Sequence, residues 1–171
     1  MVLPPSLRKF TLALHVTGSV GLLGAIAIFL VLAIAGLFST DDQTIRASYL
    51  AMQISTKFVI LPLALAALLT GVVQALGTPW GLFRHYWVLL KLLLTTFAIT
   101  ILLLKLRLIS EAARLAAEGM LPRAELRNVG LQLMVHAAGG LGVLLLAMIL
   151  SIYKPQGLTA YGWRKQREKS P

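Results

Sequence analysis

The chain has 171 residues, of which 58% are hydrophobic, and it carries 16 lysines and arginines against 6 aspartates and glutamates. The apolar share exceeds the ~45–50% of soluble domains. The basic residues lie mostly beside apolar runs, where anionic lipid and the positive-inside bias account for them without a nucleic-acid partner. The lack of cysteine excludes disulfides, thiolate metal sites and cysteine catalysis. Composition therefore predicts one membrane domain that binds no nucleic acid.

The first apolar run covers residues 11–38 and follows the basic pair Arg8 and Lys9. It is well beyond the ~7–15 residues of a signal-peptide core, so the sequence predicts a retained spanning helix. A small-residue face that begins at Gly18 would let another helix approach closely. His15 lies on the same side, one turn earlier.

A polar link at residues 39–48 leads to a second apolar run at residues 49–76. Gln53 and Lys57 recur at helical spacing with small residues, which collects the polar side chains on one face. We expect that face to look into a bundle. Pro62 frees the carbonyl of Phe58 from its helical partner, so a kink is predicted there.

A turn at residues 77–85, with two glycines, a proline and a tryptophan, introduces the third apolar run at residues 86–104. Its aromatic residues suit the layer between headgroups and hydrocarbon. Lys91 falls inside the run, one turn before Thr95. The helix is expected to continue beyond the membrane to Gly119, because Arg114 lies at helical spacing from a glutamate on either side.

The fourth apolar run covers residues 130–153 and carries His136 on a face of polar and small residues. The basic, aromatic tail at residues 154–171 is rich in Pro and Gly, so we expect it not to pack but to lie on anionic lipid at the membrane surface. Each run reaches the ~20 residues that cross a ~30 Å hydrocarbon core. The predicted fold is all-α, an up-down four-helix bundle in a membrane.

Basic residues near the helix ends favour a multi-pass protein of the bacterial cytoplasmic (inner) membrane with both termini in the cytoplasm. With this orientation the inner side carries Arg8, Lys9, Arg84, Lys91, Lys154, Arg164, Lys165, Arg167 and Lys169, and the outer side carries Arg46, Lys105, Arg107, Arg114, Arg123 and Arg127. The turn at residues 77–85 then lies inside, and the links before the second and fourth runs lie outside.

Depth along the helices predicts two polar clusters. His15 and Lys91 lie near the inner face, with room for a planar ligand between the first and third helices. Lys57 and His136 lie about two turns in from the outer face, where we expect them to share an environment. At ~1.5 Å per residue, His15 and His136 are separated by well over ~10 Å along the membrane normal, so they cannot ligate one iron together.

Each of these residues has an alternative role. Lys91 can extend its ammonium to the inner headgroups or pair with a ligand. Lys57 has no acid in any span to pair with, which leaves a neutral lysine, carbonyl contacts or an anionic ligand. His136 can hydrogen-bond across the bundle. His15 and His136 are the metal-ligand candidates, although histidines without Cys, Asp or Glu beside them make a poor metal site.

Nearly the whole chain resembles an actinobacterial family of small four-helix integral membrane proteins, a domain of unknown function, through the segments L-H-V-T-G-S-V-G, G-T-P-W-G-L-F-R-H-Y-W-V-L-L-K-L-L-L-T and S-I-Y-K-P-Q-G-L-T-A-Y-G-W-R-K. More distantly, an early histidine in the first helix, the sequence W-V-L-L-K in the third and Lys-Pro closing the fourth resemble small four-helix bacterial protoporphyrinogen oxidases and copper-resistance membrane domains. This resemblance implies that His15 and Lys91 occupy tetrapyrrole-binding positions and that haem b is a candidate cofactor.

Two functions follow from the sequence. The first is a membrane module that binds a tetrapyrrole-like or other anionic, flat ligand between helices, with His15 or His136 as axial ligand and Lys91 or Lys57 pairing with its carboxylates. The second is a non-enzymatic accessory or assembly protein, in a homo- or hetero-oligomer, whose polar residues serve helix packing and anchoring. The sequence assigns no enzymatic activity to either.

Overall fold

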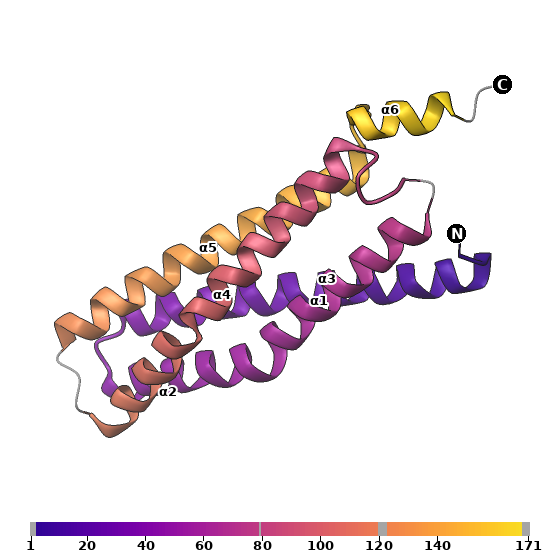
Figure 1. Cartoon of the computed structure of the whole chain (residues 1–171). Helices are drawn as coiled ribbons and strands as arrows, with labels where there is room; N and C mark the ends of the chain where they lie inside the picture. The colour runs from indigo at the N-terminus through magenta and orange to yellow at the C-terminus, as the bar shows by residue number, and fades with distance from the viewer. Residues whose placement is uncertain (1–2, 79, 120–122, 169–171) are drawn as a thin grey trace.

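The computed structural model describes residues 3–78, 80–119 and 123–168, and this part of the chain is built from helices without a β-strand (Figure 1). In chain order the elements are α1 (Pro5–Phe38), α2 (Asp42–Ser55), the π-helical turn η1 (Thr56–Ile60), α3 (Leu61–Gly77), α4 (Tyr86–Glu118), α5 (Arg123–Tyr153) and α6 (Ala160–Arg167). The predicted all-α class is confirmed.

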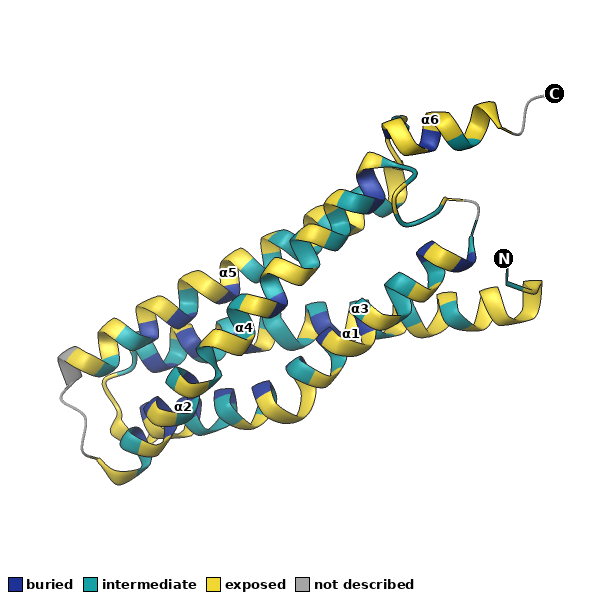
Figure 2. Cartoon of the chain, viewed as in Figure 1, coloured by how far each residue is buried: buried dark blue, intermediate teal, exposed yellow. Residues whose placement is uncertain are grey.

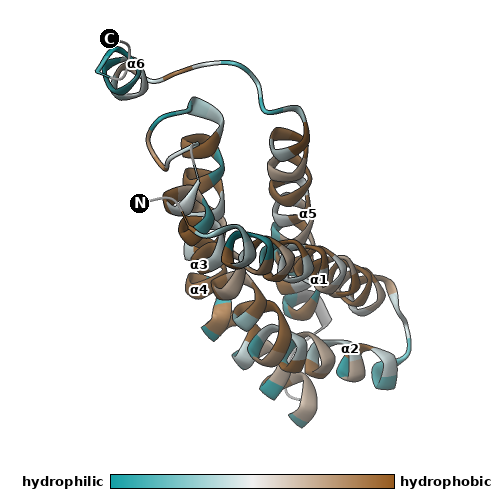
Figure 3. Ribbon diagram, turned by 90° about the vertical axis from the view of Figure 1, so that its right-hand side faces the viewer, coloured by the Kyte–Doolittle hydropathy of each residue, from teal (hydrophilic) through white to brown (hydrophobic). Residues whose placement is uncertain are grey.

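The long helices form an up-down four-helix bundle. Helix α1 packs against α2, α3 and α5, and α4 packs against the same three helices from the opposite corner. Helix α1, the continuous run from α2 to α3, α4 and α5 are each long and apolar enough to cross a membrane. In Figure 3 apolar residues predominate along these helices, and many large apolar side chains are exposed, among them Phe58 (74%) and Leu104 (69%). Such a surface suits lipid as its solvent.

The buried side chains are unevenly spread along the bundle (Figure 2). The larger core cluster runs through the half that contains α2 and includes Tyr49, Met52 and Leu133. A second, small cluster of Ala75, Trp87 and Val88 lies at the α3–α4 turn. Towards that end α4 and α5 diverge from α1 and α3 (Figure 1).

Helix α2 begins earlier than the sequence predicted, because Asp41 caps it. The Asp41 carboxylate accepts from the backbone N–H of Thr44 at 2.9 Å and of Gln43 at 3.4 Å. These bonds satisfy amides that have no partner inside the helix. The predicted link at residues 39–48 is therefore reduced to residues 39–41.

The kink expected at Pro62 takes the form of η1. The backbone N–H of Leu61 bonds to the carbonyl of Thr56, five residues earlier, instead of the usual four. A π-helical turn inserts extra backbone just before the proline, whose ring would otherwise meet the carbonyl of Phe58. The distortion is thus local, and helix continues on both sides of it.

The tail packs, so the prediction that it would not is wrong. Thr159 donates its backbone N–H to the carbonyl of Arg84 at 3.0 Å and its hydroxyl to that of Phe83 at 2.5 Å. The same hydroxyl accepts from the N–H of Gly162 and caps α6. A side chain at Gly162 would overlap the Arg84 carbonyl, so glycine permits the close approach. Irregular backbone in the α3–α4 turn thereby gains partners from the tail.

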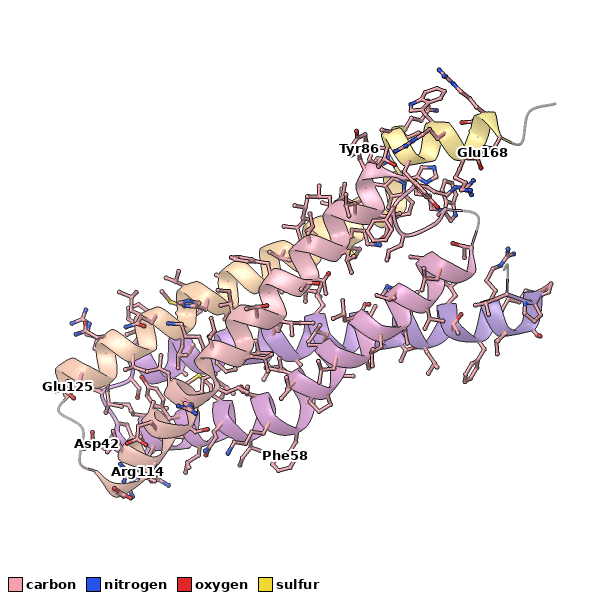
Figure 4. The ribbon with its side chains drawn as sticks, in the orientation of Figure 1. Asp42, Phe58, Tyr86, Arg114, Glu125 and Glu168 are labelled. Carbon is pink, nitrogen blue, oxygen red and sulfur yellow. The ribbon has the colours of Figure 1, made fainter. Side chains whose placement is uncertain are left out.

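Both chain ends lie beside the α3–α4 turn. The N–H of Leu3 bonds to the carbonyl of Gly77 at 3.1 Å, and the tail contacts bring α6 to the same end. Figure 4 shows Tyr86 and Glu168 there, with Asp42, Arg114 and Glu125 at the other end. The termini and this turn therefore share one end of the bundle. That this end faces the cytoplasm stays a prediction.

Candidate functional site

His15 is joined to α3 by a hydrogen bond that fixes its tautomer. Its Nδ1 lies 3.0 Å from the hydroxyl of Thr70. That hydroxyl has one proton and donates it to the carbonyl of Ala66 at 2.6 Å, so it accepts from Nδ1–H of the imidazole. Nε2 of His15 therefore keeps its lone pair and is the nitrogen able to ligate a metal or accept a proton.

The contact between α1 and α3 is close around this imidazole. A Cβ placed on Gly71 would lie 3.1 Å from the Cε1 atom of His15, so the glycine makes room for the ring. One turn further along α3, Gln74 donates to the backbone carbonyl of Thr11 at 2.9 Å. These contacts close α1 onto α3, which is part of the second span. The planar ligand is expected between the first and third spans, which are α1 and α4, so that expectation stays a prediction.

Lys91 is half-buried and forms its contacts with neutral groups. Its ammonium donates to the hydroxyl of Ser151 on α5 at 2.5 Å and lies 5.4 Å from the centre of the Trp87 ring. The Ser151 hydroxyl in turn donates a hydrogen bond to the carbonyl of Ala147 at 2.8 Å. The acidic residues of the chain, Asp41, Asp42, Glu111, Glu118, Glu125 and Glu168, all lie outside the apolar runs. No Asp or Glu side chain is therefore available to Lys91 within the spans.

Trp87 adds a second donor beside this lysine. Its indole Nε1–H is buried and has no hydrogen-bond partner within the described part of the chain. Buried N–H groups nearly always have a hydrogen-bond partner, so an acceptor is expected for this indole N–H. The ring also makes edge contact with Trp80, with centroids 5.8 Å apart.

The predicted pair of His15 and Lys91 lies at the same end of the bundle, where His15 is bonded to α3 and Lys91 to α5, and no hydrogen bond joins the two within the described residues. With Thr70 and Ser151 these side chains form a polar layer to which α1, α3, α4 and α5 each contribute one residue. Thr70 was not predicted. Its spacing of four from Gln74 in an apolar helix is the signal that would have found it.

His136 and Lys57 lie elsewhere, and the structure does not bring them together. His136 is exposed and donates Nδ1–H to the carbonyl of Gln132 in its own helix at 2.5 Å, not across the bundle. Lys57 is exposed on η1, whose main packing partners are α1, α2 and α3. At ~1.5 Å per residue, His136 also lies about 22 Å along α5 from Ser151 and hence from the polar layer.

The described residues contain no group of three His, Cys, Asp or Glu side chains that could hold a metal ion. A macrocyclic cofactor makes a smaller demand on the protein than a bare metal ion, because it needs only one or two axial donors and a cation for its carboxylates. His15 Nε2 and the Lys91 ammonium fit that demand. No family model, no curated protein and no solved structure matches the chain, so a functional assignment rests on the polar layer itself.

Proposed function

We propose that this chain is a membrane module that binds a flat, carboxylate-bearing ligand of the tetrapyrrole class at the polar layer. The observation that carries the proposal is Lys91, a half-buried ammonium in a span without any acid to pair with. A lysine at the centre of a spanning helix costs about 2.5–3.5 kcal/mol on insertion scales, and less near the edge. A ligand carboxylate would supply the missing anion and would also be an acceptor for the Trp87 indole.

The ligand would lie between α1 and the α4–α5 pair, because α1 and α3 are closed onto each other. The ligand would contact His15 from α1 and Lys91 from α4. His15 presents Nε2, since Thr70 holds the proton on Nδ1. If the ligand is haem b, His15 would be its axial ligand and Lys91 the partner of a propionate, and the iron would supply redox chemistry.

The resemblance to protoporphyrinogen oxidases and copper-resistance membrane domains supports the tetrapyrrole class. The same proposal places the module in the bacterial cytoplasmic membrane as a member of the actinobacterial family that it resembles. The proposal requires only that the end of the bundle with the polar layer faces the side of the membrane from which the ligand comes.

The alternative is an accessory or assembly protein, and a specific observation favours it. His15, Lys91 and Gln74 each already hydrogen-bond to a neighbouring helix. Interhelical bonds of this kind fix helix pairing in a membrane without any ligand. Under this alternative the polar layer is a packing device only.

Absorbance and titration distinguish the two functions. The full chain, purified in mild detergent, is titrated with haemin, and bound small molecules are identified by mass spectrometry. We expect a Soret band that His15→Ala abolishes and Lys91→Met weakens, while His136→Ala, the matched histidine control, leaves it unchanged. A titration that is identical in the wild type, His15→Ala and Lys91→Met would overturn the proposal in favour of the accessory role.

A further inference from the structure

A second polar site lies between α2 and α4, on the surface of the bundle at the end opposite the polar layer. It is an open groove of about 820 Å³ lined by Leu50, Gln53, Leu106, Arg107, Ser110, Glu111 and Arg114. Arg114 is seen in Figure 4 at the end of the molecule that is remote from Tyr86. The groove is thus separate from the polar layer, and nothing proposed for that layer depends on it.

The α2 wall of the groove belongs to a longer stripe made of three polar residues and Leu50. Arg46, Leu50, Gln53 and Lys57 follow one another at spacings of four, three and four, which places them on one side of the helix. Arg46 reaches across to the end of α4, where its guanidinium lies 3.7 Å from the position of a Cβ on Gly119. The stripe therefore faces α4, with Arg46 at the outer rim and Lys57 one turn beyond Gln53.

The charges of the groove are unequal. Arg114 is held by Glu111 at 2.6 Å and by Glu118 at 2.8 Å, so this cluster of one arginine and two glutamates offers no free positive charge and is negative by one charge. Arg107 is exposed, and within the described part of the chain no carboxylate forms an ion pair with it. Two exposed cations, Arg107 in the groove and Lys57 one turn beyond Gln53, thus have no carboxylate partner within the described residues.

Lys57 does not line the groove itself, but it lies one helical turn from Gln53, close enough for its long side chain to reach the edge of the groove. Side chains on a helix lean towards its N-terminus. Because α2 and α4 run in opposite directions, Lys57 leans outwards along the stripe, while Arg107 leans inwards from just beyond the apolar run that ends at residue 104. Both residues therefore lie near the inner end of the groove, where the apolar run of α4 ends and hydrocarbon gives way to headgroups.

We propose that this groove binds the phosphate of an anionic phospholipid such as phosphatidylglycerol. Arg107 and Lys57 would hold the phosphodiester, with Gln53 and Ser110 as further donors. Leu50 and Leu106 would contact the acyl chains. A second copy of this chain does not suit the site, because its spans contain no acid and would bring only further cations. The proposal also accounts for a lysine on an exposed face of an apolar helix.

Native mass spectrometry of the full chain tests the site. The protein is reconstituted in vesicles of equal parts phosphatidylcholine and phosphatidylglycerol, released, and scored for retained lipid. We expect one tightly retained phosphatidylglycerol, with each of Arg107→Gln and Lys57→Gln weakening retention about fivefold. Arg107→Lys, which keeps the charge, should retain most of the binding and shows that the fold is intact.

Arg127→Gln is the matched control, an exposed arginine on α5 outside the groove. Equal loss of lipid in this variant, or equal retention of phosphatidylcholine, would show general surface attraction and overturn the proposal. Displacement of the lipid by millimolar inorganic phosphate would likewise overturn it, in favour of a site for a soluble anion.

Discussion

Nδ1 of His15 and the hydroxyl of Thr70, 3.0 Å apart, join α1 to α3 inside the apolar part of the bundle. The threonine proton is already committed to the carbonyl of Ala66, so the bond runs from imidazole to hydroxyl. This one bond therefore fixes the pairing of α1 with α3. It also fixes the tautomer of His15, the only histidine in the polar layer.

Replacing Thr70 by valine should release the tautomer of His15. We expect nitrogen NMR of the labelled wild type to show Nδ1 protonated and Nε2 unprotonated, and the Thr70→Val variant to show a mixture of tautomers. Thr100→Val is the control, because Thr100 is exposed and bonds only to its own helix. A protonated Nε2 in the wild type would contradict the assignment.

Two glycines of α5 should respond oppositely to alanine. A Cβ on Gly130 would lie 2.9 Å from the hydroxyl of Tyr49, which is buried and held by the carbonyl of Leu126 at 2.7 Å. Gly130→Ala should therefore destabilise the bundle by about 1–3 kcal/mol. A Cβ on Gly139 meets nothing within 4 Å, so Gly139→Ala should be neutral or stabilise by up to ~1 kcal/mol. Unfolding of both variants in detergent measures the difference.

The cap at Asp41 should show a simple dependence on pH. Its hydrogen bonds from the Thr44 side chain, and then from the backbone, lower the pKa of its carboxyl below 3.8. A lowered pKa in the folded state means that the stabilisation is complete above the unfolded value and is lost as the pH falls through the folded one. Carbon NMR of the carboxyl should give a midpoint below 3.8.

Asp41→Asn checks the same cap by another route. Asparagine caps helices about as well as aspartate but does not titrate in this range. The α2 terminus of this variant should stay ordered through the acid titration, while Asp41→Ala should lose the cap at every pH. Identical acid behaviour of Asp41→Asn and the wild type would show that another group controls this region.

Topology can be measured with reporter fusions. We expect alkaline phosphatase to be inactive when fused after Ser170 and active when inserted in the link at residues 119–123, since the basic residues favour a cytoplasmic location for the end with both termini. The structure requires only that both termini and the α3–α4 turn lie on the same side of the membrane. The opposite pattern of activities would invert the orientation and leave the bundle unchanged.

The sequence by itself determined the number of spanning helices and the class of fold. It also predicted the extension of α4 to Glu118, where Arg114 bonds to both flanking glutamates. These features depend on the length of apolar runs and on contacts within one helix, which the order of residues encodes directly. The distortion at Pro62 was likewise predictable, because proline removes a helical hydrogen bond wherever it stands.

Only the tertiary structure decided which faces look inwards. In lipid both the buried and the exposed face of a helix are apolar, so hydrophobic periodicity does not fix its rotation about its axis. This is why Lys57 and His136 were wrongly expected to share an interior face. The bond from Lys91 to Ser151 spans 60 residues, and the docking of the tail on Arg84 spans 75. Such contacts arise only when the folded bundle brings distant backbone and side-chain groups within hydrogen-bonding distance.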